Sequence, residues 1–152
     1  MMKVLKLLTS LLALTFSISA LARDPIETGT FNNHAIYGYD TVAYFTENKA
    51  VRGKKTNSYA WRGADWHFAS TAHRELFIAD PEKYSPQYGG YCAYAMSDGR
   101  LVSIDKDAFT IHAGKLYLNY SNSVMKEWRK EMTQFIAEAD AIYPTVVDLP
   151  TN

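Results

Sequence analysis

The clearest alternation of hydrophobic and polar residues lies over residues 58–70. A two-residue turn at Gly63-Ala64 would pair Trp61 with Trp66 in an antiparallel hairpin. The aromatic residues that then share one face are Tyr59, Trp61, Trp66 and Phe68. His67 falls on the opposite, polar face, so we expect it in solvent.

A second hairpin is predicted from residues 110–112 and 115–120, which flank Ala113-Gly114. Two further apolar runs, at 42–45 and 91–96, are short enough to be strands. These segments predict a small antiparallel sheet built from hairpins.

Ser70 or Thr71 is expected to be the N-cap of a short helix that ends near Asp80. Leu76 and Phe77 are expected to face the core. Asp80 also precedes a proline, which predicts a new helical turn at Pro81.

A long C-terminal helix is predicted from about Ser121 to Ile142, with Pro144 ending it. Apolar residues recur along it at three- and four-residue steps and form one stripe. They are Val124, Trp128, Met132, Phe135, Ala139 and Ile142. The fold class expected is therefore α+β, with a small antiparallel sheet, one short helix and a long C-terminal helix.

The first 22 residues have the features of a secretory signal peptide. Lys3 and Lys6 precede an apolar run over 7–18, and Ala20 and Ala22 stand two apart at the end. Cleavage after Ala22 would deliver the protein to the periplasm or the medium. We expect residues 23–34 to be a flexible leader, 35–144 the domain and 145–152 a tail.

Charge and composition narrow the function classes. Removal of the two signal-peptide lysines leaves 14 basic against 16 acidic residues. A protein that binds nucleic acid usually has an excess of basic residues, so this charge balance argues against nucleic acid as a partner. The mature chain has no second long apolar segment, so no membrane span is expected. The carboxylates show no paired spacing and no serine has a nucleophile-elbow setting, so an enzyme is not predicted.

Five ordered motifs resemble a known family. Segments 38–45 (GYDTVAYF), 66–70 (WHFAS) and 80–84 (DPEKY) resemble the YHS domain. Segments 86–95 (PQYGGYCAYA) and 115–120 (KLYLNY) resemble its exported, stand-alone bacterial branch. The resemblance covers about residues 35–144 and implies an exported accessory protein.

Many YHS domains are similar to small metal-handling modules with three cysteines. At the matching positions this chain has Ala43, Ala69 and His73, so the resemblance carries over the scaffold and not a complete ligand set. If a soft metal ion such as copper or zinc binds, Cys92 and His73 are the residues we expect to hold it. Met96 would lie roughly 13 Å from Cys92 along a strand and is expected to be filler.

Each candidate ligand has a structural alternative. Cys92, the chain's one cysteine, also fits a small buried hydrophobe. His73, in the first turn of the predicted helix, also fits an ordinary packing residue. Six tyrosines of the central segment form either an aromatic core or a pocket or partner surface. They are Tyr84, Tyr88, Tyr91, Tyr94, Tyr117 and Tyr120.

The sequence thus leaves three functional hypotheses. The first is a non-enzymatic YHS-type accessory protein that binds a soft metal ion through Cys92 and His73. The second is a structural or protein-interaction module that uses an aromatic surface and no metal. The third is a redox protein that acts through the Cys92 thiol.

Overall fold

The computed structural model describes residues 23–149. The predicted signal peptide, residues 1–22, and the last residues of the predicted tail lie outside this range. The α+β class is confirmed, with two small antiparallel hairpins and a long C-terminal helix. Over the described range, none of the helices has the length and apolar character needed to cross a membrane.

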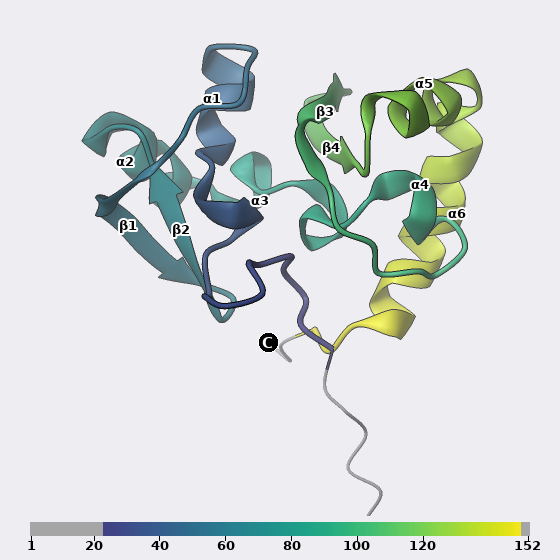
Figure 1. Cartoon of the computed structure of the whole chain (residues 1–152), viewed down its shortest axis with the longest axis horizontal. Coiled ribbons are helices and arrows are strands. Elements are labelled where there is room, and N and C mark those ends of the chain that lie inside the picture. Colours follow the sequence, from purple (N-terminus) through teal and green to yellow (C-terminus); the bar gives the residue numbers. More distant parts are fainter. Residues whose placement is uncertain (1–22, 150–152) are drawn as a thin grey trace, which may run out of the picture.

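The elements form two groups (Figure 1). The N-terminal half holds α1 (Thr41–Thr46), β1 (Lys54–Trp61), β2 (Ala64–Phe68) and α2 (Thr71–Ala79). The C-terminal half holds α4 (Ala93–Met96), β3 (Asp105–His112), β4 (Lys115–Asn119), α5 (Asn122–Lys130) and α6 (Met132–Val146). Between them in sequence lie α3 (Pro81–Tyr84) and η2 (Gln87–Gly90), and η1 (Ile36–Gly38) precedes α1.

The first hairpin turns at Arg62-Gly63 and not at the predicted Gly63-Ala64, so Trp61 pairs with Ala64 and Tyr59 with Trp66. Both turn residues have positive φ, and glycine suits the second position of such a turn. The partner of Tyr59 moves by two residues, which keeps every side chain on its predicted face. The aromatic face is therefore confirmed, and it packs on Phe77 of α2.

The prediction for His67 was wrong. His67 is only 6% exposed, because the N-terminal segment lies beside β2, joined to it by the parallel bridge between His34 and Asp65. The imidazole of His34 lies over that of His67, with ring centroids 4.2 Å apart. The covering segment is remote in sequence, which the alternation along β2 could not reveal.

The two isolated apolar runs were wrongly predicted as strands. Residues 42–45 belong to α1, because the Asp40 side chain caps this helix by accepting from Val42 N and Ala43 N. Residues 93–96 form α4, a single turn that follows Cys92. Short apolar runs suit a buried helix as well as a strand. The second hairpin is confirmed as β3 and β4, with β3 longer than predicted.

Helix α2 begins after Ser70, whose side chain accepts from His73 N, as predicted. Asp80 caps α3 in the same way through Lys83 N. Phe77 is fully buried, whereas Leu76 is 41% exposed and was wrongly placed in the core. Successive residues of a helix point about 100° apart, and only a narrow face of α2 packs on the core, with Phe77 as its buried residue.

The predicted C-terminal helix is divided into α5 and α6 at Glu131, whose backbone leaves the helical region. The helix starts where it was predicted, and the Ser121 side chain caps α5 by accepting from Val124 N. Pro144 lies inside α6 and does not end it, a second correction. A proline removes one backbone hydrogen bond, and the last turns of an otherwise packed helix tolerate that loss.

The expected leader, residues 23–34, packs against the domain. Ile26 is 3% exposed, and Glu27 N donates to the carbonyl of Gly89 across 2.8 Å. Four of the six central tyrosines are buried in the core, as the core hypothesis predicted, whereas Tyr120 is 56% exposed. The buried four are Tyr84, Tyr88, Tyr91 and Tyr117.

Candidate functional site

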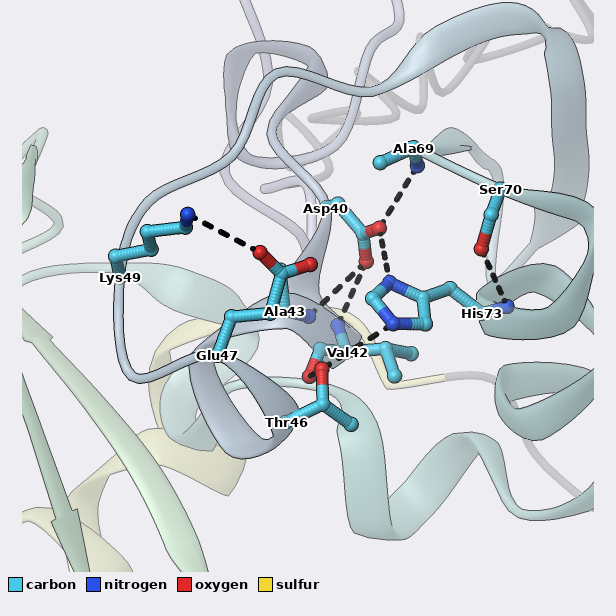
Figure 2. A network of polar contacts seen from close by, with 9 residues as sticks. All are labelled: Asp40, Val42, Ala43, Thr46, Glu47, Lys49, Ala69, Ser70 and His73. Atoms are coloured by element: carbon cyan, nitrogen blue, oxygen red, sulfur yellow. Dashed lines mark hydrogen bonds and ion pairs between the residues drawn. The ribbon is translucent and has the colours of Figure 1, made fainter.

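Asp40 is the centre of a buried polar network that joins α1 to α2 (Figure 2). Its side chain is fully buried. Oδ1 accepts from Val42 N at 2.9 Å and Ala43 N at 3.2 Å. Oδ2 accepts from Ala69 N at 2.8 Å and from His73 Nδ1 at 2.7 Å. Four N–H donors thus saturate the carboxylate. We call Asp40 and these four partners the Asp40 network.

The Asp40 network brings together the three positions where the YHS resemblance expects cysteines. Ala43 and Ala69 supply backbone amides to Asp40, and His73 supplies its ring. A thiolate metal site does not fit here, because two of the three side chains are methyl groups. The carboxylate of Asp40 is already committed to four N–H donors.

The ring of His73 is held at both nitrogens. Nδ1 donates to Asp40, and Nε2 lies 3.2 Å from the hydroxyl of Thr46 at the end of α1. The same hydroxyl lies 3.3 Å from the carbonyl of Val42, so this carbonyl and Nε2 of a neutral ring compete for its single proton. The His73 side chain is 14% exposed, so this pairing is largely shielded from water. The His73 side chain therefore connects α2 to both ends of α1, through Asp40 at its start and Thr46 at its end.

Cys92 belongs to a different network, in the C-terminal half. Its Sγ accepts from Tyr120 N at 3.3 Å and lies 3.6 Å from Asn119 Oδ1. Asn119 Oδ1 also accepts from Tyr94 N at 3.1 Å. Cys92 is 1% exposed and shares no hydrogen-bond partner with His73. The two predicted ligands therefore belong to separate hydrogen-bond networks.

The cavity next to Cys92 is largely apolar but contains one cation. The thiol lines this space of about 280 Å³ with Tyr94, Val102, Tyr120 and Arg100, among others. Met96 is fully buried in the neighbouring core, as the filler hypothesis predicted. Within residues 23–149 no three His, Cys, Asp or Glu side chains lie close enough together to hold a metal ion.

A polar cavity of about 290 Å³ lies between the two halves. We call it the inter-half cavity. Trp61 and Arg62 come from the first hairpin, Glu82 from α3, Lys115 from β4, and Asp140 and Tyr143 from α6. The connecting residues 85–89 and Ile26 complete its lining. Segments that lie far apart in sequence thus meet around one space.

Aromatic hydroxyls and charged groups give the cavity its chemistry. Tyr88 donates to Asp140 Oδ1 at 2.9 Å, and burial together with this acceptor raises the pKa of the phenol. Tyr143 donates to the carbonyl of Pro25 at 2.7 Å, and burial raises its pKa to about 12. Both phenols therefore stay neutral donors at physiological pH.

The wall at residues 88–89 has unusual backbone geometry. Tyr88 has φ of 56° and Gly89 has φ of 62°. A side chain at Gly89 would overlap the carbonyl oxygen of Pro25, so this position needs glycine for space as well as for φ. Strained residues of this kind persist where the surroundings hold them, often at ligand sites.

Sequence reasoning missed Asp40 as the centre of the network and the residues of the inter-half cavity. Asp40 carried a usable signal, since an aspartate two residues before a buried apolar run is a typical N-cap. Asp140 and Lys115 carried none, because an isolated charge in a sequence does not reveal what lies across from it. We compared the chain with protein-family models, curated proteins and solved structures, and none of them matches it.

Proposed function

We propose that this chain is an exported, non-enzymatic accessory protein of the YHS type that acts by binding a small molecule in the inter-half cavity. The observation that carries the proposal is the convergence of distant segments, with their charged and aromatic side chains, on one polar cavity. Pockets of this kind between substructures are the usual place for small-molecule sites.

The Asp40 network supports the same choice over a metal function. At the three positions where the resemblance expects metal ligands, this chain has two methyl groups, which cannot bind a metal ion, and one imidazole, whose nitrogens lie 2.7 Å from Asp40 Oδ2 and 3.2 Å from the Thr46 hydroxyl. Cys92 is committed to a separate network. Soft-metal binding by Cys92 and His73 would need these two networks to open and rearrange.

One experiment separates the two functions. Amide resonances of the ¹⁵N-labelled mature protein are recorded with the low-molecular-mass fraction of a bacterial periplasmic extract, and separately with copper or zinc salts. The proposal expects the extract to shift the resonances of Arg62, Tyr88, Lys115 and Asp140. Shifts confined to the surroundings of Cys92 and His73 on metal addition would instead support the metal hypothesis.

A matched variant locates the binding. Trp61→Ala removes an aromatic wall of the cavity, and Trp128→Phe changes an aromatic residue buried elsewhere. The extract-induced shifts should weaken in the first variant and persist in the second. Equal shifts in both would contradict the cavity as the binding site.

A further inference from the structure

We infer that residues 29–34, which we call the N-terminal loop, form an acid-operated cover over β2. The cover lies closed while the rings of His34 and His67 are neutral, and it opens when both rings are protonated. This movement is a property of the chain itself and needs no ligand in the inter-half cavity, so it goes beyond the proposed function.

The two ends of the N-terminal loop are anchored to the domain. Ile36 N donates to the carbonyl of Glu27 at 2.9 Å, and Thr28 pairs with Ala35 in an antiparallel bridge. Ala35 and Ile36 are buried, whereas Phe31 at the tip is 98% exposed. The tip can therefore move while the base of the loop stays in place.

Few contacts hold the N-terminal loop against the first hairpin. Asp65 N donates to the carbonyl of Asn33 at 2.8 Å, and Asn33 Nδ2 donates to the carbonyl of Gly63 at 2.6 Å. The third contact is between the rings of His34 and His67, whose centroids are 4.2 Å apart. Opening of the loop thus breaks two hydrogen bonds and separates one pair of rings.

Positive charge predominates around the two rings. The charged groups that face His67 are His34 from the loop, Arg52 from the segment before β1, Lys55 from β1 and Asp65 from β2. Helix η1 contributes only Gly38 beside Nδ1, which adds no charge. Asp65 is the one carboxylate of this set, and among residues 23–149 it forms no ion pair with either ring.

A proton on these rings is poorly compensated while the loop is closed. Burial lowers the pKa of His67, and the other basic groups lower it further, against the opposite effect of Asp65. Two imidazolium rings in contact also repel each other. Opening of the loop exposes both rings to water, where histidine ordinarily titrates near pH 6.5. The open form therefore binds protons more readily than the closed form, so acid shifts the equilibrium towards opening.

His73 provides a contrast within the same chain. Its side chain is also largely buried, at 14% exposure, but its Nδ1 lies 2.7 Å from the carboxylate of Asp40. That carboxylate can compensate a positive ring. Burial alone thus does not make a histidine contact acid-sensitive, whereas the lack of a paired carboxylate at His34 and His67 does.

Hydrogen exchange at the Asp65 amide measures the opening, because this N–H loses its acceptor on Asn33 when the loop moves. Exchange rates of the ¹⁵N-labelled mature protein are recorded by NMR from pH 7.5 to pH 5 and corrected for the intrinsic rate at each pH. Linkage lets the opening constant rise by up to about tenfold per pH unit for each proton taken up. We expect the protection of Asp65 to fall at least about tenfold between pH 7 and pH 5.

Urea distinguishes loop opening from unfolding of the hairpin. Trp66, which pairs with Tyr59 of β1, is the internal reference for unfolding. At pH 5, urea below the unfolding transition should accelerate exchange at Trp66 and leave exchange at Asp65 unchanged. The reason is that loop opening exposes little surface, and the effect of urea scales with the surface exposed.

Phenylalanine variants test the two rings, because phenylalanine keeps an aromatic contact and cannot take up a proton. His34→Phe and His67→Phe should each reduce the acid-induced fall in Asp65 protection, and the double variant should abolish it. His112→Phe, at the end of β3, should leave the fall as large as in the unaltered protein. Thermal melting checks that each variant is folded.

Three results would overturn the inference. The first is equal corrected protection of Asp65 at pH 7 and pH 5, and the second is a fall that persists in the double phenylalanine variant. The third is equal acceleration of Asp65 and Trp66 exchange by urea, which would mean that acid unfolds the whole hairpin. If His67→Phe does not fold, His34→Phe decides alone, and an undiminished fall in that variant overturns the inference.

Discussion

The imidazole of His73 donates from Nδ1 to the carboxylate of Asp40 across 2.7 Å, although 33 positions separate the two residues. Asp40 caps α1, and His73 lies in the first turn of α2. Together with the contacts of Ala69 N to Asp40 and of Thr46 to His73, this hydrogen bond fastens the two helices to each other. This geometry makes Asp40 the residue whose removal affects the most partners.

We predict that Asp40→Ala lowers the free energy of unfolding by about 3 kcal/mol, because it leaves buried N–H groups and the His73 ring without an acceptor. Urea unfolding monitored by tryptophan fluorescence measures this change. Asp98→Ala is the control, since that exposed carboxylate pairs only with Arg100 and its loss should cost less than about 0.5 kcal/mol. Equal effects of the two substitutions would show that the Asp40 network is not a stabilising centre.

Gly89 and Gly63 form a matched pair of positive-φ glycines. Gly63 has φ of 76° with open space around it, whereas a side chain at Gly89 would meet the carbonyl of Pro25. Gly63→Ala should cost about 1 kcal/mol from backbone strain alone. Gly89→Ala should cost more than about 3 kcal/mol, because the N-terminal segment must also move. Similar melting temperatures for the two variants would contradict the close approach.

The stability of the protein should decrease as the pH falls below about 6.5, the ordinary pKa of histidine. Burial lowers the pKa of His67 in the folded protein, and His34, Arg52 and Lys55 act in the same direction against Asp65. The unfolded chain then binds a proton at a higher pH than the native state does. The contribution of neutral, buried His67 to the stability of the folded protein is present above pH 6.5 and is lost as the pH falls towards the lowered pKa.

The variant His67→Gln tests this pH dependence. Denaturant midpoints measured from pH 7.5 to pH 5 should fall less steeply in His67→Gln than in the unaltered protein. His112→Gln, at the end of β3, serves as the control. An unchanged slope in His67→Gln would assign the acid sensitivity to other groups.

We predict that Cys92 reacts at least about 100-fold more slowly with a thiol reagent in the native protein than in urea, because labelling requires local opening. The residue is 1% exposed and its sulfur accepts from Tyr120 N. Absorbance of the released chromophore gives both rates. Labelling of the native protein as fast as that of the unfolded protein would contradict this prediction and support the redox hypothesis for the Cys92 thiol.

Local signals in the sequence were sufficient for several elements. Ser70, Asp80 and Ser121 were each expected to begin a helix, and each does. The aromatic face of the first hairpin was also predictable, because side chains alternate along each strand and the observed register differs from the predicted one by two residues, which keeps the faces. These features depend on residues that are close together in the chain, so the sequence alone is enough to predict them.

The predictions that failed depended on distant partners. His67 alternates with buried residues as a polar-face residue should, yet the N-terminal segment covers it. The apolar run at 42–45 is helical because Asp40 caps it, and Ala69 and His73 then fix that carboxylate from far along the chain. An apolar run of four residues has no period long enough to show this choice.

Residue types and their order were enough to specify the caps of α2 and α3, the presence of two hairpins, the aromatic face of the first hairpin and the α+β class. The inter-half cavity and the separation of Cys92 from His73 arose only when the chain folded. A hydrogen bond or a cavity wall depends on distances of a few ångströms, and residues dozens of positions apart reach such distances only through the packing of every element between them.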